Sequence, residues 1–224
     1  MNGAHSQNRT FVKICGIQEE TTLREMTGLE VDCIGLVFAP SRRQVTTERA
    51  AELAKAARLV PMAGGRPPLV AGVFVDPSLD RLEEVMSAIR LDVVQLHGEE
   101  TPAFCREVGR RFGVEVWRAL PADEVTGETA RLAEYEGVVT TILLDTAGGG
   151  TGRTFRWDVI PAYQAEAAKR GLRLFVAGGL RPDNAGELIS SYRPAGVDVS
   201  SGVETDGAKD GAKIAAFVER VRNA

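Results

Sequence analysis

The segment Thr141-Ile-Leu-Leu-Asp145-Thr-Ala-Gly-Gly-Gly-Thr-Gly-Arg-Thr-Phe155-Arg-Trp157 decides how the rest of the chain is interpreted. It begins with a short apolar run, which is typical of a β-strand buried on both faces. The run ends in a carboxylate, Asp145, and three consecutive glycines follow shortly after it. Parallel α/β proteins place their chemistry at the carboxyl ends of strands, and glycines let the backbone approach a ligand closely. Asp145 is therefore either a functional carboxylate or the cap of the next helix, with the glycines forming a surface loop.

Similar apolar runs recur along the chain and alternate with helical segments. We expect eight strands, at residues 11–15, 33–38, 69–75, 93–97, 114–120, 142–145, 173–177 and 197–200. Between them, apolar residues recur at three- and four-residue steps, as in 79–89 and 214–221, which predicts amphipathic helices. Asp183-Asn184 and Asp210 are the expected starts of the last two helices, because short oxygen-bearing side chains cap free amide groups.

Eight strand–helix units in 224 residues predict one α/β domain, a (β/α)8 TIM barrel over residues 11–224. Residues 1–10 are polar and predict a short disordered tail. A doubly wound open sheet is the alternative. That fold usually has fewer units and a phosphate-binding fingerprint after its first strand, and none follows Cys15.

Composition narrows the classes of function. A net charge of −4 argues against a nucleic-acid-binding protein, and no apolar run approaches the ~18 residues of a membrane span. The amino terminus lacks the apolar core of a signal peptide. Three cysteines without CxxC spacing are typical of the reducing cytoplasm, which predicts a cytoplasmic protein. With two histidines and no ligand cluster, we expect no metal site.

In a TIM barrel the functional groups gather where strands end and the following loops begin. Applied here, this rule selects a thiol, two guanidinium groups, an imidazole, a carboxylate and two backbone-rich turns. The residues are Cys15, Arg42, Arg43, His97, Asp145, Gly178, Gly179, Ser200, Ser201 and Gly202.

The loops after the seventh and eighth strands form the common phosphate site of barrel enzymes. Here Gly178-Gly179 follows one of these strands and Ser200-Ser201-Gly202 the other. Glycine exposes amide hydrogens and serine adds hydroxyl donors, so this pair of loops predicts phosphate binding. The alternative is that both are simply tight turns.

Several side chains admit two interpretations. Cys15 is either a general base, if its pKa is modestly lowered, or an inert core residue. His97 is either an acid or base, or a neutral donor that shapes the pocket. The planar fork of Arg43 suits a carboxylate or phosphate, whereas Arg42 is expected at the solvated surface. A buried Lys13–Asp198 pair is expected inside the barrel, with Gln95 and Arg118 in the same polar layer.

The sequence resembles the phosphoribosylanthranilate isomerase family of tryptophan biosynthesis over nearly its whole length. The motifs that carry the resemblance follow the family's order, each at a strand end. They are Val12-Lys-Ile-Cys-Gly16, Gly35-Leu-Val-Phe38 with Ser41-Arg-Arg43, Val94-Gln-Leu-His-Gly98, Leu143-Leu-Asp-Thr146, Gly149-Gly-Thr-Gly-Arg-Thr-Phe155 with Trp157, Ala177-Gly-Gly-Leu180, and Val197-Asp-Val-Ser-Ser-Gly-Val203.

The resemblance implies an Amadori rearrangement of N-(5-phosphoribosyl)anthranilate without a cofactor. By the same resemblance, Asp145 is the general acid, Cys15 the general base, and Arg43 the ligand of the anthranilate carboxylate. It also implies that the chain is a monomer or a homodimer. The binding partner that it implies is a small phosphorylated molecule. The glycine loop 146–154 is expected to close over substrate. Alternatives are another phosphosugar isomerase or lyase on the same barrel, or a catalytically silent scaffold.

Overall fold

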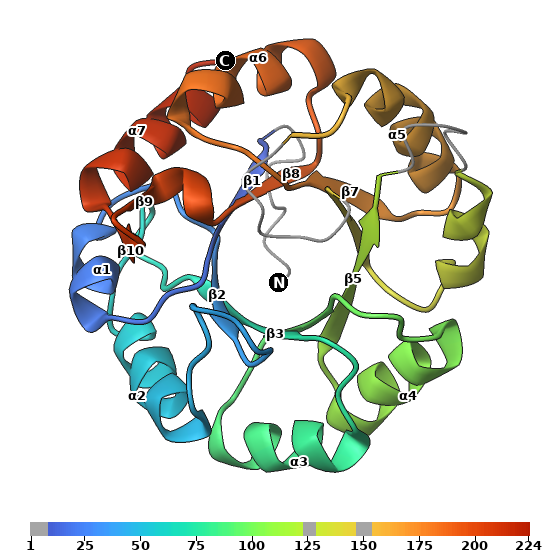
Figure 1. Cartoon of the computed structure of the whole chain (residues 1–224), viewed down its shortest axis with the longest axis horizontal. Coiled ribbons are helices and arrows are strands. Elements are labelled where there is room, and N and C mark those ends of the chain that lie inside the picture. The colour runs from blue at the N-terminus through green and yellow to red at the C-terminus, as the bar shows by residue number, and fades with distance from the viewer. Residues whose placement is uncertain (1–8, 123–128, 147–153) are drawn as a thin grey trace.

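Eight parallel strands, paired in chain order, close into a barrel (Figure 1). The computed structural model describes residues 9–122, 129–146 and 154–224. Pairing of the first strand with the last, including Lys13 beside Asp198, closes the ring. The strands are β1 (Phe11–Cys15), β2 (Cys33–Val37), β3 (Leu69–Phe74), β4 (Val93–Leu96), β5 (Glu115–Pro121), β6 (Thr141–Asp145), β7 (Arg173–Val176) and β8 (Gly196–Val199). The predicted TIM barrel is confirmed, and the open sheet is wrong.

Helices surround the barrel on its outside (Figure 1). The α-helices of the described residues are α1 (Glu20–Glu25), α2 (Thr47–Ala57), α3 (Leu79–Ala88), α4 (Pro102–Phe112), α5 (Ile160–Lys169), α6 (Pro182–Tyr192) and α7 (Gly211–Arg222). Short 3-10 helices are η1 (Ala130–Tyr135), η2 (Trp157–Val159) and η3 (Ser201–Val203). Thus the described part of the β5–β6 connection carries a 3-10 helix where the sequence predicted an α-helix. Within these ranges, no helix combines the length and apolar character needed to cross a bilayer.

The starts of the last two helices were predicted with mixed success. Asp210 caps α7, because its side chain accepts the backbone N–H of Lys213. The predicted start of α6 at Asp183-Asn184 is wrong, since the cap residue is Arg181 and Pro182 occupies the first turn. Proline favours that position because its φ is already helical and it has no N–H to satisfy. Asn184 instead accepts the backbone N–H of Arg181 through Oδ1, at 2.9 Å.

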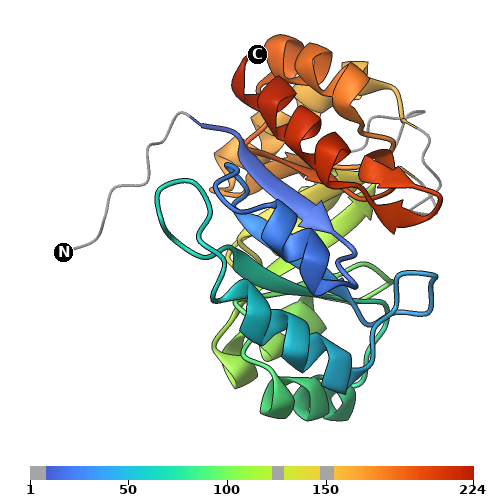
Figure 2. The ribbon, with the colours of Figure 1, turned by 90° about the vertical axis from the view of Figure 1, so that its left-hand side faces the viewer.

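A small hairpin follows η3 and was not predicted. It consists of β9 (Glu204–Thr205) and β10 (Ala208–Lys209), joined by a two-residue turn. Both turn residues, Asp206 and Gly207, have positive φ, at 51° and 84°. Asp-Gly is the sequence signal for such a turn, so local sequence could have found it. In side view, the hairpin lies at the end towards which the β1 arrow points (Figure 2).

The barrel interior is filled in layers, which leaves it open at one end only. At the amino-terminal end of the strands, the rings of Phe11, Trp117 and Phe175 pack with centroids 5.1–5.8 Å apart. The middle layer holds the expected Lys13–Asp198 pair, with Nζ 2.7 Å from Oδ2. Above it, the Cys15 side chain packs with small aliphatic residues of β2 and β3. Any ligand must therefore enter from the carboxyl end.

Arg118 does not belong to the middle layer, so that prediction is wrong. It alternates with the inward-facing Trp117 along β5, and its guanidinium therefore points to the other side of the strand. There Nη1 donates to the carbonyl of Leu96, Nη2 donates to that of Gly98, and Nη1 lies 3.3 Å from Glu100. Gln95, by contrast, faces the interior and lines the pocket described below.

The amino-terminal boundary of the domain stays a prediction. Residues 1–8 of the expected tail lie outside the described residues. Arg9 forms ion pairs with Glu30 and Asp32, and the carbonyl of Thr10 accepts a hydrogen bond from Arg222 of α7.

Candidate active site

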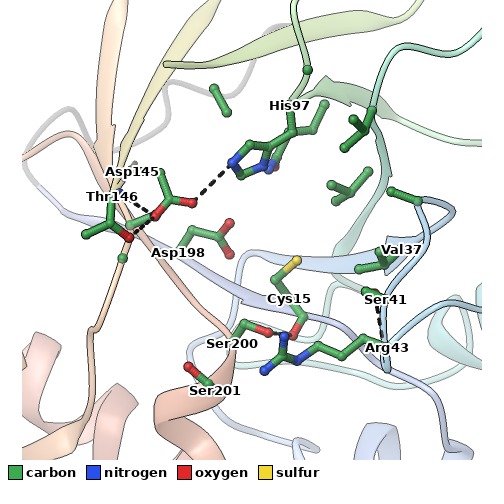
Figure 3. A pocket seen from close by; sticks show the side chains of 18 of the residues that line it. Cys15, Val37, Ser41, Arg43, His97, Asp145, Thr146, Asp198, Ser200 and Ser201 are labelled. Atoms are coloured by element: carbon green, nitrogen blue, oxygen red, sulfur yellow. Dashed lines mark hydrogen bonds and ion pairs between the residues drawn. The ribbon is translucent and has the colours of Figure 1, made fainter. Parts of the chain in front are cut away.

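A pocket of about 520 Å³ opens at the carboxyl end of the barrel (Figure 3). It brings together most of the residues that the sequence singled out, although they come from six different strands and their loops. Those lining it are Cys15, Arg43, His97, Asp145, Gly178, Gly179, Ser200 and Ser201. The side chains of Gln95 and Asp198 form part of its floor. Arg42 and Gly202 are not among the lining residues, and the Arg42 side chain is exposed as expected.

Cys15 ends β1 with its sulfur turned into the pocket (Figure 3). Only 8% of the residue is exposed. This burial raises the pKa of the Cys15 thiol, while the ammonium of Lys13 acts in the opposite direction. Gly35 makes room for both groups, since a Cβ there would lie 2.8 Å from Sγ and 3.1 Å from Nζ. The pKa of the Cys15 thiol is therefore raised, whereas its role as a base was predicted on a modest lowering. Among its neighbours, Lys13 is the group that most favours the thiolate.

Lys13 itself is held in its charged form. Burial alone would lower its pKa, but the carboxylate of Asp198 raises it above the ordinary value. The ion pair therefore places an ammonium and a carboxylate together beneath the thiol, and the Asp198 carboxylate raises the pKa of Cys15 while the Lys13 ammonium lowers it. A charge in this position is stable because it is paired, whereas an isolated one would be costly.

Asp145 ends β6 and is held on both sides. Its Oδ1 accepts the backbone N–H of Thr146 at 2.7 Å, and its Oδ2 lies 3.2 Å from Nε2 of His97. Gly178, with φ +78°, leaves the space that this carboxylate needs, because a Cβ would lie 2.7 Å from Oδ1. Figure 3 shows the Asp145 carboxylate and the Cys15 sulfur facing the same space. A proton donor and a proton acceptor can therefore reach one ligand in this pocket.

The two predicted phosphate loops lie against each other. A Cβ at Gly202 would lie 1.8 Å from the carbonyl oxygen of Leu180, so the loop after β8 packs directly on the loop after β7. Gly178 and Gly179 both have positive φ, at 78° and 63°, which favours glycine. Ser200 Oγ donates to the carbonyl of Cys15 at 3.0 Å and thus ties this loop to β1. The loops form one continuous, backbone-lined wall of the pocket.

Arg43 is bound on one edge by a residue that the sequence analysis missed. Its Nε donates to Oε1 of Glu204 at 2.7 Å and its Nη2 to Oε2 at 3.1 Å. Lys209, from the other strand of the hairpin, donates to the same carboxylate at 2.6 Å. Burial alone would raise the pKa of Glu204, but the hydrogen bonds from Arg43 and Lys209 bring it below its usual value. Glu204 is therefore a carboxylate.

Two further predictions concern metals and the glycine loop. Within the three described stretches of the chain, no group of three His, Cys, Asp or Glu side chains is arranged to hold a metal ion. The predicted lid lies outside the described residues except for Thr146 and its last residue, Thr154.

The environment of the cysteines predicts how they react. Iodoacetamide is expected to alkylate Cys15 before Cys33 and Cys105, because those two are fully buried and only Cys15 lines the pocket. The pKa of Cys105 is raised by burial to about 11. Since burial also raises the pKa of Cys15, its alkylation rate should keep rising with pH beyond about 8.5, the value of a free thiol. Peptide mass spectrometry across pH checks this, with Cys15→Ser as the blank. Equal labelling of all three cysteines in the folded protein would contradict it.

Comparison with known proteins gives consistent matches along the chain. The family model described as N-(5'phosphoribosyl)anthranilate (PRA) isomerase matches residues 12–220. The N-(5'-phosphoribosyl)anthranilate isomerase of Brevibacillus brevis is 48% identical over 217 residues, covering 95% of this chain and 94% of the relative.

Solved structures agree with these sequence matches. Monomers generated from the dimeric phosphoribosylanthranilate isomerase of Thermotoga maritima superimpose with a TM-score of 0.79 at 33% identity, covering 96% of this chain and 100% of that one. A phosphoribosylanthranilate isomerase in complex with reduced 1-(o-carboxyphenylamino)-1-deoxyribulose 5-phosphate has a TM-score of 0.77 at 32% identity, covering 96% of this chain and 100% of that one.

Proposed function

Because the chain belongs to the N-(5'-phosphoribosyl)anthranilate isomerase family, we propose that Cys15 and Asp145 are the general base and general acid of its reaction. The chain is an isomerase of tryptophan biosynthesis, as the resemblance of its motifs predicted. The observation that supports the residue roles is geometric. A thiol and a carboxylate that are distant in sequence face one pocket, beside two loops suited to phosphate.

The first step opens the ribose ring of N-(5-phosphoribosyl)anthranilate. Asp145, carrying a proton, donates it to the ring oxygen as the C1–O bond breaks, and the anilino nitrogen supplies the electron pair that forms the C1=N iminium. His97 lies 3.2 Å from Oδ2 of Asp145 and keeps that oxygen directed at the pocket. In this proposal His97 positions the acid.

The second step moves hydrogen from C2 to C1. The Cys15 thiolate removes the C2 proton, and the C–H electrons form a C1=C2 bond while the iminium nitrogen accepts its π electrons. The resulting enol then gives up its hydroxyl proton to water and takes one from water at C1, which yields the 1-amino-1-deoxyketose. Proton exchange with water returns Cys15 to the thiolate and Asp145 to the acid. Lys13 supports the thiolate, because its charge opposes the effect of burial. The substrate's own nitrogen acts as the electron sink, so the proposed steps use no cofactor.

Substrate binding uses the two anionic groups of the molecule. We assign the phosphate to the wall formed by Gly178-Gly179 and Ser200-Ser201, and the ring carboxylate to Arg43. The predicted phosphate residue Gly202 does not line the pocket but packs against Leu180 and so joins the two loops. The ligand named in the complexed relative carries both groups, a carboxyphenyl ring and a 5-phosphate. The two proposed anion sites adjoin each other beside Cys15, since Ser200 hydrogen-bonds its carbonyl and the Arg43 guanidinium lies next to Ser200 (Figure 3).

The decisive test is a fluorescence assay. Phosphoribosylanthranilate is generated in situ, and its fluorescence is expected to fall as the purified protein consumes it, with the aminodeoxyribulose phosphate as product. Identification of that product by mass and by its ketone chemistry separates this reaction from other phosphosugar isomerases or lyases. Steady fluorescence in the presence of folded protein would contradict the proposal and favour a silent barrel.

Arg43→Ala is expected to raise KM for phosphoribosylanthranilate roughly tenfold to hundredfold with little change in kcat. A hydrogen bond to a charged group contributes about 1.5–3 kcal/mol, and the ring carboxylate is bound equally in the ground and transition states. Steady-state kinetics in the same assay measure the split. Arg110→Ala is the matched control, because Arg110 also pairs with a glutamate, Glu107, but its side chain is exposed on α4 and is not among the residues lining the pocket. A fall in kcat at unchanged KM would reverse the assignment of Arg43.

The predicted assembly, a monomer or a homodimer, has a parallel in a relative. The Thermotoga maritima protein is described both as a dimer and as monomers generated from it, so both states occur among relatives. For this chain, the monomer or homodimer, the cytoplasmic location and the domain bounds stay predictions.

A further inference from the structure

Glu204 is a buried carboxylate that the proposed chemistry leaves without a role. It follows η3 in the hairpin after β8, and its side chain is 4% exposed. Three cationic side chains surround it, namely Arg42 at 2.5 Å, Arg43 at 2.7 Å and Lys209 at 2.6 Å. Burying a carboxylate is costly unless it is paired, and here the three cations pair with it.

The contact with Arg43 is directional. Glu204 receives Nε and Nη2, which form one edge of the guanidinium plane, at 2.7 and 3.1 Å. A guanidinium carries five N–H donors in a fixed fork, so binding one edge fixes the direction of the other. Within the described residues, Nη1 donates to no protein acceptor, and Arg43 lines the pocket. The free edge is thus presented to a ligand.

The remaining parts of Arg43 and its surroundings are also fixed. Its aliphatic stem lies over Gly16, where a Cβ would be 2.6 Å from Arg43 Cδ. Lys209 bridges Glu204 to the phosphate wall, because its Nζ also donates to the carbonyl of Ser200 at 3.0 Å. Glu204 therefore connects the arginine to the loop that is assigned to phosphate.

The charge balance of this cluster suits an anion. Three cations and one carboxylate leave a net charge of +2 beside the pocket. A simple Arg43–Glu204 pair would be neutral and would attract an anion weakly, whereas the added Arg42 and Lys209 preserve a positive potential. The carboxylate thus orients the arginine without cancelling the attraction.

We propose that Glu204 is a positioning residue that aims the free edge of Arg43 at the ring carboxylate of the substrate, and so sets specificity for a carboxylate-bearing aryl group. This inference rests on the proposed function, in which Arg43 binds that carboxylate. It makes Glu204 act through Arg43, without touching the reacting atoms. Its loss should therefore affect discrimination between ligands and not the proton transfers.

The test compares two ligands by isothermal titration calorimetry. One is reduced 1-(o-carboxyphenylamino)-1-deoxyribulose 5-phosphate, and the other is the corresponding phenylamino compound without the carboxylate. The unmodified protein should bind the first at least tenfold more tightly. Glu204→Gln keeps the shape but loses the charge and one acceptor, so the ratio should fall below threefold while the Kd of the carboxylate-free ligand stays within twofold. In turnover, KM should rise roughly tenfold to hundredfold at nearly constant kcat.

Two further variants separate positioning from general damage. Glu166→Gln is the matched control. The Glu166 carboxylate also accepts hydrogen bonds from a lysine and an arginine, Lys169 and Arg170, but it lies on the outer helix α5. It should keep the full ligand ratio. Arg43→Lys keeps the charge but loses the fork, and should reproduce the Glu204→Gln result. The double variant should be no worse than either single one, because both remove the same interaction. If Glu204→Gln does not fold, Arg43→Lys and Glu204→Asp carry the same test. The aspartate side chain is too short to accept hydrogen bonds from both Nε and Nη2 of Arg43.

Each outcome decides the matter. An unchanged ratio in Glu204→Gln overturns the proposal, as does an equal loss of affinity for both ligands, which would assign Glu204 to the phosphate loop. Tighter binding of the carboxylate ligand would mean that Glu204 competes with substrate for Arg43, and would also overturn it. Failure of the proposed function looks different, because the unmodified protein would then fail to consume phosphoribosylanthranilate or to prefer the carboxylate ligand.

Discussion

Cys15→Ala is expected to lower kcat for phosphoribosylanthranilate by roughly 10²–10⁴-fold, with KM changed only a few-fold. The variant removes the group that takes the C2 proton, whereas both proposed anion sites stay in place. Cys15 is the only cysteine whose sulfur lines the pocket, and the described residues include all three. The fall in fluorescence as substrate is consumed measures kcat, and thermal unfolding shows whether the variant is folded.

Two companions make the Cys15 result specific. Cys15→Ser has nearly the same size, but its hydroxyl is a far weaker acid than the thiol and provides no anion near neutral pH, so it should be as inactive as the alanine variant. Cys105→Ala removes a fully buried thiol from α4, away from the pocket, and should keep kcat even if it costs stability. A Cys15→Ala enzyme within tenfold of normal turnover would exclude the thiol as the base.

Asp145→Asn is expected to lower kcat by a similar roughly 10²–10⁴-fold factor, because an amide of the same shape cannot deliver a proton to the ring oxygen. The asparagine can keep the hydrogen bond from the backbone N–H of Thr146, which is 2.7 Å in the parent protein. The Kd of the reduced product analogue should therefore change little. Turnover and calorimetry together measure the two effects.

The acid role of Asp145 has its own control. Asp80→Asn makes the same chemical change on the exposed surface of α3 and should leave turnover as it was. If Asp145→Asn weakened binding of the analogue as strongly as it slowed turnover, the carboxylate would be a binding group. If it slowed turnover less than tenfold, the proton would have to come from elsewhere.

The barrel could be predicted closely from the sequence because its strands are buried on both faces. Continuous apolar runs such as Ile142-Leu-Leu144 stand out against the helical pattern, and each strand end was located to within one residue. Since all strands of a parallel barrel end on one rim, knowing those ends was enough to group Cys15, His97 and Asp145. This part of the site follows from topology alone.

What could not be predicted depends on contacts between distant residues. Glu204 meets Arg43 across 161 positions of sequence, and neither residue carries a local signal for the other. Arg118 was wrongly assigned because a fully buried strand shows no alternation of polar and apolar residues to indicate which side chains face inward. The local Asp206-Gly207 signal could have revealed the hairpin, but not the partner of its glutamate.

The ion pair between Lys13 and Asp198 joins the first strand to the last, and this has a consequence for biosynthesis of the chain. The two residues are separated by 185 positions, so the pair can form only after the whole stretch between them has left the ribosome. Until then, the Lys13 ammonium lacks the carboxylate with which it is paired in the folded barrel. Ring closure of this kind is slow, because the entropy of a very long loop is lost before the contact is gained. Catalytic competence should therefore arise late and all at once, at the moment when β8 docks.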